Sequence, residues 1–518
     1  MFLRYIGSLL LCTVFVPAFS QILSDALGYH ENAALYSRVN YQGTGRMTAM
    51  GGAATALGAD MFGIPINPAG LGMYRKGEVG VSLSLLNGRS TSEYNSPTSS
   101  SSYATGFSNF SMPNIGIVFT NTNDAPNDGP WRSGSFAVSL NRLDDYERTF
   151  SYRGTNSAGS SNPMNSMRDW FVNVANTSEI NPNSLNNQLG NNNFVDDIFG
   201  AAYWNYMLNF DNDEGRYFTI DPDVDAIQDE VVTESGKKQQ LNFAYAGNYD
   251  DKLYIGANVG VLFIDHTQKR VYTEQSGQSG STFQDFTLTQ EESTSGVGVN
   301  LNVGALYRFS DRFRWGLSIQ TPTALRLTED YSADITTNYN NLELSEGQSV
   351  NGIETRVRPS QLEYRLNTPL ILRTGFSSFF SKNGFITAEM EYIPYQMMSL
   401  STDFDPLRGD NSVIQNQYRA GINLKAGGEY RYDNFRFRGG YAYYDRQMRQ
   451  EFDPERKGMH NITTGLGMRF AEYYADISFV YNIINERYSR YEHPSAPSFD
   501  VDTKSNRLFV TLSGGLYF

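Results

Sequence analysis

The sequence has almost no cysteine and no long apolar segment, and each absence excludes a common class of protein. Cys12 is the only cysteine among 518 residues, and it lies in a segment with the features of a cleavable signal peptide. We therefore expect no disulfide and no zinc–thiolate site in the mature chain. Beyond that segment no run of about 18 apolar residues occurs, so the sequence predicts no transmembrane helix.

Basic residues and histidines are also scarce. Lys and Arg total 41 against 55 Asp and Glu, and the net charge of −14 disfavours a nucleic-acid partner. The histidines are His30, His266, His460 and His493, and no two of them have the spacing of metal ligands. No Gly-x-Ser-x-Gly nucleophile motif occurs either. We predict that the protein is not an enzyme and has no catalytic residue, metal site or cofactor.

Residues 1–20 have the three parts of a secretory signal peptide. Arg4 supplies the basic start, residues 9–16 form the apolar centre, and Ala18-Phe19-Ser20 is a small-x-small cleavage site. The sequence therefore predicts an exported protein whose mature chain begins at Gln21.

The C-terminal residues alternate between apolar and polar side chains. One face carries Leu508, Val510, Leu512, Leu516 and Phe518, and the other carries Arg507, Thr511, Ser513 and Gly515. This period of two is typical of a strand between two different solvents, and about ten such residues, tilted, cross a bilayer. A strand ending on an aromatic residue also resembles the signal that the outer-membrane assembly machinery recognises. We infer that this strand spans the outer membrane and that this machinery is a partner.

The same pattern recurs in fourteen segments separated by turn residues. They lie near 78–87, 113–120, 134–143, 239–248, 253–264, 297–309, 313–328, 365–380, 384–400, 417–432, 435–447, 460–470, 473–487 and 506–518. From the fourth segment on, short turns alternate with long loops near 265–296, 329–364, 401–416, 448–459 and 488–505. This rhythm is typical of outer-membrane barrels, whose periplasmic turns are short and whose extracellular loops are long. The sequence predicts an all-β fold: a 14-stranded antiparallel transmembrane β-barrel. We expect a monomer in the outer membrane of a Gram-negative cell, in contact with lipid and lipopolysaccharide.

Residues 21–77 precede the first strand and do not alternate. Residues 43–63 are rich in glycine and alanine, and Asn67-Pro68-Ala69-Gly70-Leu71 follows. Small side chains allow close backbone packing, and the lumen of a fourteen-strand barrel has room for a plug of this length. The predicted organisation is a signal peptide at 1–20, an N-terminal plug at 21–77 and a barrel at 78–518.

The plug resembles the N-terminal hatch of a known family. The similar segments are Gly45-Arg46-Met47-Thr48-Ala49-Met50-Gly51-Gly52-Ala53, Ala56-Leu57-Gly58-Ala59-Asp60 and Asn67-Pro68-Ala69-Gly70-Leu71. The family is that of the outer-membrane long-chain fatty acid transporters, which includes toluene-uptake proteins, in its Bacteroidota-type branch. The resemblance implies fourteen strands and a hatch inside the lumen, with Arg46, Gly51, Gly52, Asn67, Pro68 and Ala69 as hatch motif residues.

The resemblance also implies a function. Members of the family carry hydrophobic molecules passively, without a cofactor. A solute is captured at the extracellular loops, passes to a pocket against the hatch, and leaves sideways through the barrel wall at a kinked strand. The substrate expected here is fatty-acid-like or aromatic. Two other roles described for relatives stay open at this point. One is a protein-interaction barrel that serves type IX secretion, and the other is hemin binding through one histidine.

Residues 144–238 are too many for an idle loop, and we predict a partly helical extracellular loop there. One helix is expected to begin at Asn162-Pro163 and a second to run from Phe194 to Met207. The candidate ligand-binding residues are Trp170, Phe171, Phe199, Trp204 and Met207 in this loop, with Met50 and Phe62 in the plug. The alternative is that these side chains only pack against one another, the barrel rim and the barrel wall.

Three arginines are candidates for recognising a substrate carboxylate. Arg46 lies in the plug, and Arg436 and Arg438 are expected to face the lumen. The alternative is that these arginines form salt bridges with acids of the lumen, such as Glu389, Glu391 and Glu429.

Overall fold

The computed structural model describes residues 28–96, 99–122, 129–158, 165–222, 224–344, 347–380, 382–403, 407–453, 457–491 and 499–518. The predicted signal peptide and Cys12 lie outside these described residues. No helix within the described ranges has the length and hydropathy needed to cross a bilayer.

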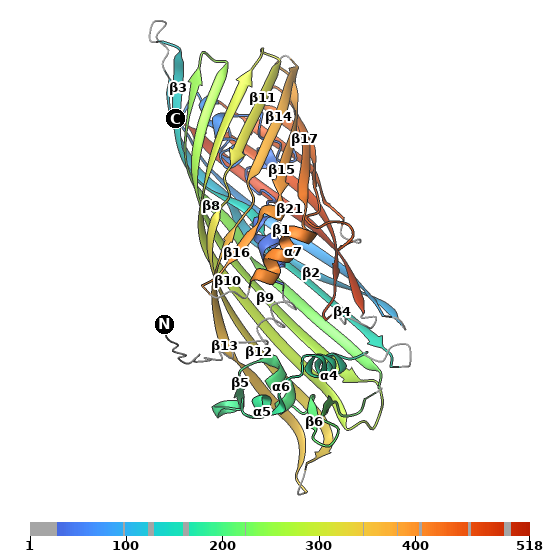
Figure 1. Ribbon diagram of the computed structural model, residues 1–518. Helices are drawn as coiled ribbons and strands as arrows, with labels where there is room; N and C mark the ends of the chain where they lie inside the picture. The colour runs from blue at the N-terminus through green and yellow to red at the C-terminus, as the bar shows by residue number, and fades with distance from the viewer. Residues whose placement is uncertain are drawn as a thin grey trace, which may run out of the picture.

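Fourteen antiparallel strands pair in sequence order and close into a barrel, as the sequence predicts (Figure 1). Ten are single segments: β1 (Glu78–Asn95), β2 (Ser100–Thr122), β8 (Ala226–Tyr249), β9 (Leu253–Ser276), β10 (Phe283–Arg308), β17 (Ala420–Tyr432), β18 (Phe435–Tyr444), β19 (Met459–Arg469), β20 (Tyr473–Tyr488) and β21 (Asp500–Tyr517). Four consist of two segments: β3 (Trp131–Asp145) with β4 (Arg148–Asn156), β11 (Phe313–Gln320) with β12 (Ala324–Glu343), β13 (Ser349–Asn367) with β14 (Ile371–Phe380), and β15 (Gly384–Pro394) with β16 (Ser399–Ser401). Pairing of β1 with β21 closes the barrel.

The closing ladder continues into the N-terminal segment at one end of the barrel. The backbone N–H of Gly77 donates to the carbonyl of Phe518 at 2.8 Å, and the N–H of Phe518 donates to the carbonyl of Gly77 at 3.0 Å. The last residue of the chain is therefore bonded to the residue that immediately precedes β1.

The strands are much longer than predicted, and the predicted loops 265–296 and 329–364 are wrong. β9 continues to Ser276 and β10 begins at Phe283, so most of the first loop is strand. In the same way β12 reaches Glu343 and β13 begins at Ser349. β10 has 26 residues, whereas about 9–11 suffice to cross a bilayer. Its outer part lies beyond the membrane, where the outward face meets no lipid and carries polar side chains, so the apolar outer face used to find strands is lost there.

The two faces of the strands follow the predicted alternation. On β21 the side chains of Leu512, Leu516 and Phe518 point away from the barrel, and Leu512 is 55% exposed. Thr511 and Ser513 on the same strand are buried on the inner side. The large apolar side chains on the outside of the barrel therefore form the surface that meets lipid.

We expect Leu512→Arg to cost about 2–4 kcal/mol of folding free energy, because an arginine there would stand in the hydrocarbon of the bilayer. The measurement is equilibrium urea unfolding of the protein in lipid vesicles. Phe435→Arg is the control, because Phe435 follows the short turn at the barrel end, and it should cost only about 0–1 kcal/mol. Equal costs for the two variants would contradict the assignment of the membrane position.

The two ends of the barrel differ. Short turns and the C-terminus lie at one end, which marks it as periplasmic, and three helices lie at the opposite, extracellular end (Figure 1). These are α4 (Met167–Thr177), α5 (Pro182–Asn186) and α6 (Ile198–Trp204) in the connection between β4 and β8. The same connection contains η3 (Asn191–Asn193), β5 (Phe194–Val195) and a small hairpin of β6 (Asn209–Asp211) and β7 (Arg216–Phe218).

The predicted boundaries in this connection need correction. Asn162 and Pro163 lie outside the described residues, and the first helix begins at Met167. Ser166 caps it, and the side chain of Asp169 accepts from the backbone of Ser166 in a capping box. The second helix begins at Ile198 and not at Phe194, because Phe194 and Val195 pair with β13 as a short parallel strand. Moreover, the connection spans only the residues between Asn156 and Ala226, since β4 and β8 extend into the predicted loop.

Residues 28–77 form a segment of short helices inside the barrel. Its elements are α2 (Tyr29–Ser37), α3 (Gly45–Thr48), η1 (Met61–Gly63) and η2 (Pro68–Met73). α2 packs in an apolar cluster with the inner wall and with α7 (Arg408–Gln417), which follows η4 (Tyr395–Met397) and β16. A second apolar cluster lies at the extracellular end and includes α4 and α6. The barrel interior is thus filled by protein at two levels.

Candidate functional site

The N-terminal segment packs closely against the wall at the turn Met50-Gly51-Gly52. Gly51 and Gly52 have φ values of 68° and 74°, a left-handed conformation that glycine adopts without strain. A β-carbon added to Gly51 would lie 2.8 Å from the carbonyl oxygen of Tyr441. On the wall, a β-carbon on Gly427 would lie 2.3 Å from the carbonyl oxygen of Met50. Backbone therefore packs directly on backbone, which only glycine on both sides allows.

Other wall glycines receive the segment in the same way. A β-carbon on Gly316 would lie 1.9 Å from the carbonyl oxygen of Thr55, and one on Gly256 would lie 2.6 Å from that of Pro68. Glycines of the barrel strands therefore make the recess in which the segment sits.

A buried carboxylate on β15 ties the segment to the wall. Oε2 of Glu389 accepts hydrogen bonds from the amides of Ala54 and Thr55, both at 2.9 Å, and from the Thr55 hydroxyl at 2.7 Å. Its other oxygen pairs with Nζ of Lys425 at 2.9 Å. Four donors thus converge on one carboxylate, three of them from the N-terminal segment.

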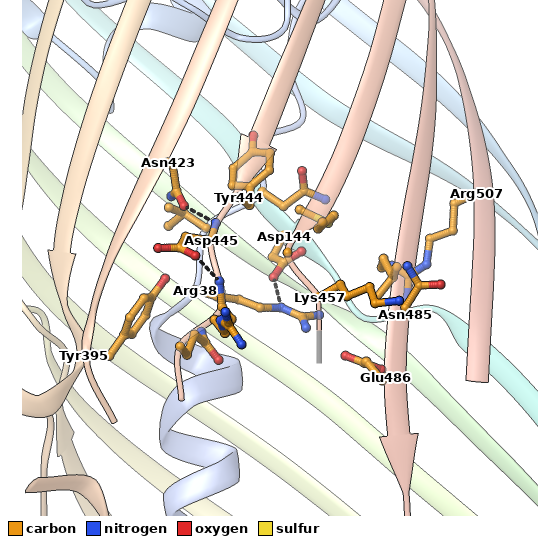
Figure 2. Close-up of a pocket in the computed structure, with 17 residues that line it drawn as sticks. Arg38, Asp144, Tyr395, Asn423, Tyr444, Asp445, Lys457, Asn485, Glu486 and Arg507 are labelled. Carbon is orange, nitrogen blue, oxygen red and sulfur yellow. Dashed lines mark hydrogen bonds and ion pairs between the residues drawn. The ribbon is translucent and has the colours of Figure 1, made fainter. Parts of the chain in front are cut away.

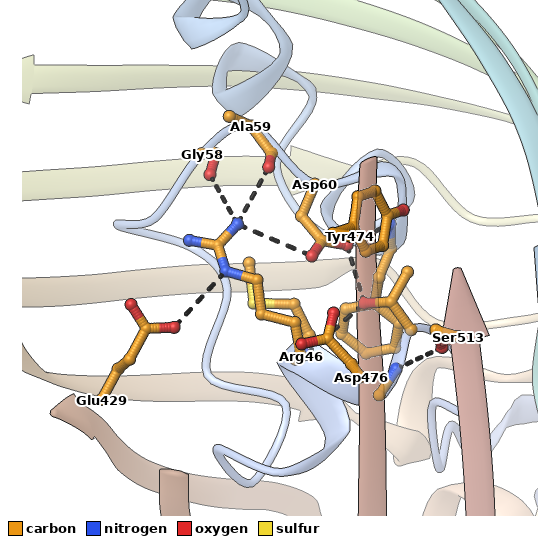
Figure 3. Close-up of polar contacts among 12 residues, drawn as sticks. Arg46, Gly58, Ala59, Asp60, Glu429, Tyr474, Asp476 and Ser513 are labelled. Atoms are coloured by element: carbon orange, nitrogen blue, oxygen red, sulfur yellow. Dashed lines mark hydrogen bonds and ion pairs between the residues drawn. The ribbon is translucent and has the colours of Figure 1, made fainter. Parts of the chain in front are cut away.

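Arg46 also joins the segment to the wall (Figure 3). Its Nη1 donates to the carbonyl of Ala59 at 2.9 Å and lies 3.6 Å from the carboxylate of Asp60, and its Nε lies 4.0 Å from Glu429 of β17. The Asp60 carboxyl is buried, and burial raises its pKa above the ordinary value, although Arg46 and the Phe62 amide favour the charged form. Arg46 is thus engaged by protein carboxylates, as the salt-bridge alternative expects.

The two lumen arginines differ from each other. Arg438 pairs with Glu429 at 2.8 Å and with Asp476 at 2.6 Å, and all three groups are buried. Arg436 instead donates to the backbone carbonyls of Asp433 and Phe435 at the periplasmic turn. Neither geometry leaves the guanidinium directed at a ligand cavity, which again favours a structural role for both.

The Asn-Pro-Ala motif fixes the start of η2 against β10. The side-chain amide of Asn67 donates to the carbonyls of Thr55 at 2.7 Å and Ala305 at 3.2 Å, while its oxygen caps the amide of Ala69 at 3.1 Å. Pro68 occupies the first turn, where no N–H is needed. Asn67 therefore links two parts of the N-terminal segment and one barrel strand.

The barrel wall contains a seam between β2 and β4. β2 pairs with β3 only from Asn114 to Thr122, and among the described residues its part from 100 to 113 forms no backbone pairs with β4. Pro113 has no N–H to give to the ladder. It lies in a bulge of β2 between Asn114 and Ser111, opposite Ser82 to Ser84 of β1, and β3 has a second bulge between Arg142 and Asp144. The wall is complete only by side-chain contacts at this place.

The contacts that bridge the seam come mainly from small polar side chains. The Ser99 hydroxyl, just before β2, donates to the carbonyl of Thr155 at 2.7 Å, and the hydroxyl oxygens of Thr105 and Ser151 lie 2.6 Å apart. Nδ2 of Asn109 donates to Glu147 at 3.1 Å. These bonds hold two strands together without a shared ladder.

The N-terminal segment covers the seam from the lumen side. The amide of Asn40 donates to the carbonyl of Leu143 at 3.0 Å, and the amide of Gln42 donates to that of Arg142 at 3.1 Å. Arg38 also pairs with Asp144 at 2.8 Å. Residues 38–42 therefore lie along the stretch of β3 that β2 leaves unpaired.

A cavity of about 70 Å³ lies beside the same residues, between the end of α2 and strands β17 to β21 (Figure 2). The lining is mostly polar and includes Arg38, Asp144, Asn423, Asp445, Lys457, Glu486 and Arg507. Its three carboxylates are already paired, Asp144 with Arg38, Asp445 with Arg419 at 2.6 Å and Glu486 with Arg148. The cavity has the size and polarity for a small polar group and is too small for a hydrophobic chain. No sequence motif pointed to it.

The candidate ligand residues of the extracellular helices are packed together. Phe171, Phe199 and Met207 are buried, and the rings of Phe171 and Phe199 meet edge to face with centroids 5.4 Å apart. Trp170 and Trp204 are half-buried, and Trp204 donates its Nε1 hydrogen to the carbonyl of Leu185 at 3.0 Å. The helices thus bury their apolar faces against each other and the barrel rim, which is the packing alternative.

Met50 and Phe62 are likewise buried inside the N-terminal segment. Met50 contacts the wall glycines, and the ring of Phe62 lies 6.1 Å from that of Tyr41. Both residues pack the segment against itself and the wall in this closed arrangement.

We expect the double substitution Trp170→Ala with Phe199→Ala to loosen α4 from α6 while the barrel stays folded. Loss of a buried aromatic ring costs about 3–5 kcal/mol, and that loss falls on the loop helices. Limited proteolysis should then cut the loop faster, whereas the barrel should keep its heat-dependent shift on gels. Phe218→Ala in the same loop is the control, because that ring is exposed. Unchanged proteolysis of the double variant would contradict the packing described here.

The three described histidines lie in different places and have protein partners. The imidazole of His30 bonds to Tyr418, that of His266 to Tyr36 and that of His460 to Tyr441, while His493 lies outside the described residues. Within the described ranges, no three His, Cys, Asp or Glu side chains come together as a metal site would require.

The closed barrel, with its apolar outer surface, short turns at one end and structured loops at the other, defines a transmembrane β-barrel of the Gram-negative outer membrane. Comparison with known families then matches residues 227–453 to the model described as outer membrane protein transport protein (OMPP1/FadL/TodX). The resemblance drawn from residues 45–71 is thereby confirmed in a different part of the chain.

Solved structures have the same fold. The chain superposes on the Pseudomonas putida toluene transporter TodX with a TM-score of 0.50 and 11% identity, covering 91% of this chain and 97% of that one. It superposes on a Pseudomonas aeruginosa FadL homologue with a TM-score of 0.51 and 12% identity, covering 92% and 98%. At this identity the likeness establishes the fold alone. No curated protein matches the sequence.

Proposed function

We propose that this protein is a passive outer-membrane transport protein for hydrophobic small molecules, fatty-acid-like or aromatic, which leave the barrel sideways between β2 and β4. The observation that carries the proposal is the seam. It is a stretch of wall without a backbone ladder, covered from inside by residues 38–42 of the N-terminal segment. The matched family description and the fold shared with a toluene transporter support the same class of substrate.

The seam suits lateral exit because it can open at low cost. Each side-chain hydrogen bond across it contributes only about 0.5–1.5 kcal/mol, and water or lipid headgroups can replace it. A hydrophobic solute gains about 25 cal/mol per Å² of apolar surface that it keeps out of water. Passage from the lumen directly into the bilayer avoids the aqueous periplasm, so diffusion down a gradient needs no energy source and no catalytic group.

In this proposal the N-terminal segment is the hatch. Its residues 38–42 must move away from Leu143 and Arg142 before a solute can reach the seam from the lumen, whereas Glu389 and the wall glycines hold the region around Thr55 in place. A local shift of the segment is therefore sufficient, and the whole hatch stays in the barrel.

Capture is proposed at the extracellular helices. Trp170 and Trp204 are half-buried and border the apolar cluster that contains Phe171, Phe199 and Met207. A solute that enters between α4 and α6 would contact these side chains first. At the hatch it would then contact Met50 and Phe62. The Trp170→Ala, Phe199→Ala variant is therefore also expected to lower uptake.

The test is uptake by a Gram-negative host that lacks its own transporter of this kind and expresses the full chain. Cells should take up radiolabelled oleate or toluene faster than vector controls, and an uncoupler should not change the rate at early times. The purified barrel should also release a hydrophobic small molecule into organic extracts. Failure to take up either solute, together with a protein that copurifies in constant ratio, would replace this proposal with a protein-interaction role.

A further inference from the structure

A groove of about 440 Å³ lies on the outer, lipid-facing wall at strands β15, β17 and β18. This volume falls within the range of about 300–1,000 Å³ that is typical of small-molecule sites. Its lining includes Phe380, Ile386, Gly428, Tyr430, Phe437 and Gly439. Most of the lining is aromatic, aliphatic or glycine backbone, so the groove suits a hydrocarbon.

The groove exists because two glycines meet across the ladder. Gly428 and Gly439 are direct partners on β17 and β18, and both point outward. A β-carbon on Gly439 would meet only one atom within 4 Å, the carbonyl oxygen of Thr463 at 3.9 Å. Around this bare backbone stand four large side chains that are 47–55% exposed, Phe380, Ile386, Tyr430 and Phe437, with Tyr432 beyond them. The glycines form the floor and the large side chains form the walls.

The groove reaches the periplasmic end of the barrel. Asn383 belongs to the short turn between β14 and β15, Gly384 begins β15, and Lys382 is exposed in the same turn as Asn383. Tyr430 and Tyr432 stand near the end of β17, where tyrosines mark the boundary between hydrocarbon and headgroups. An acyl chain in the groove would thus have its headgroup at the level of Lys382.

We propose that this groove binds one acyl chain of an anionic phospholipid in the periplasmic leaflet, with the phosphate beside Lys382. The groove is continuous with the lipid-facing surface, so lipid is the molecule that meets it. Gly428 and Gly439 have no side chain, so they leave the groove open. A flexible acyl chain can fill it. The lysine adds a positive charge where the phosphate would lie.

The site can be tested by native mass spectrometry of the full-length barrel released from detergent with added phosphatidylglycerol or phosphatidylethanolamine. Wild type should retain one phosphatidylglycerol more strongly than the other lipids that it carries. Gly439→Leu fills the groove with an outward, lipid-compatible side chain and should lose that adduct. Gly514→Leu is the matched control, because Gly514 also points outward with open space, its nearest atom being the Tyr474 carbonyl oxygen at 3.6 Å. It should retain the adduct.

The variant Lys382→Gln tests the contact with the headgroup separately from the contact with the acyl chain. It should lower the preference for phosphatidylglycerol over phosphatidylethanolamine about fivefold while the barrel still retains a lipid. Heat-dependent gel mobility verifies that every variant is folded. Equal retention of phosphatidylglycerol by wild type and Gly439→Leu would overturn the site. Displacement of the adduct by oleate at the same concentration as the phosphatidylglycerol would also overturn it, since the groove would then belong to a transported solute. Neither outcome bears on uptake through the seam.

Discussion

Uptake of a hydrophobic solute is expected to fall to the level of cells without the protein when a disulfide closes the seam. The variant is Thr105→Cys with Ser151→Cys, whose native hydroxyl oxygens lie 2.6 Å apart on β2 and β4. That separation brings the two Cβ atoms near the distance of about 3.5–4.5 Å that a disulfide requires. The only cysteine of the chain lies in the predicted signal peptide, so the mature variant would contain a single pair.

A matched disulfide elsewhere in the wall provides the control for this experiment. Thr267 and Ser293 face each other on β9 and β10 with hydroxyl oxygens 3.2 Å apart, in a continuous ladder. Thr267→Cys with Ser293→Cys should leave uptake unchanged, whereas a reductant should restore uptake in the seam variant. Normal uptake by the fully oxidised seam variant would exclude exit between β2 and β4.

The second large effect is expected for Glu389→Ala, which should destabilise the protein by about 3–5 kcal/mol. The substitution leaves the amides of Ala54 and Thr55 without their acceptor and removes the closer of the two carboxylates beside Lys425, the other being Glu391 at 3.9 Å. The N-terminal segment should then become accessible to protease while the strands stay paired.

Urea unfolding in vesicles measures the stability change, and N-terminal sequencing of protease fragments locates the cut. Glu363→Ala is the control, because Glu363 is 60% exposed and its pairing with Arg326 at 3.6 Å is a surface contact worth about 0–1 kcal/mol. If Glu389→Ala were as stable as the control, the carboxylate would not be an anchor of the segment.

The strands could be predicted from the sequence wherever lipid imposes an apolar face. Leu512 and its neighbours alternate because one side of β21 meets hydrocarbon and the other meets the lumen. The outer part of β10 has no such constraint, and a stretch such as Thr289-Gln290-Glu291-Glu292 carries no period that distinguishes strand from loop. The length of the strands beyond the membrane could therefore not be predicted from the alternation of apolar and polar side chains.

The contacts of the N-terminal segment were only partly predictable. Its small residues predicted close packing, and the wall glycines opposite Met50, Thr55 and Pro68 provide it. Glu389 is separated from Thr55 by 334 positions in the sequence, and nothing local distinguishes it from other inward-facing acids. The seam was equally hidden, because the absence of a ladder beside Pro113 depends on where β4 runs and not on β2 itself.

The bond between Gly77 and Phe518 fixes an order of events during biogenesis. β1 begins one residue after Gly77. It can pair with β21 only after β21, the last strand in the sequence, has reached the membrane. Once these two strands pair, the barrel is closed around residues 28–77, whose wall contacts extend from β3 to β21. The N-terminal segment must therefore be in place before β1 and β21 pair along their whole length. If β1 and β21 paired before that, the barrel would close with the N-terminal segment outside it.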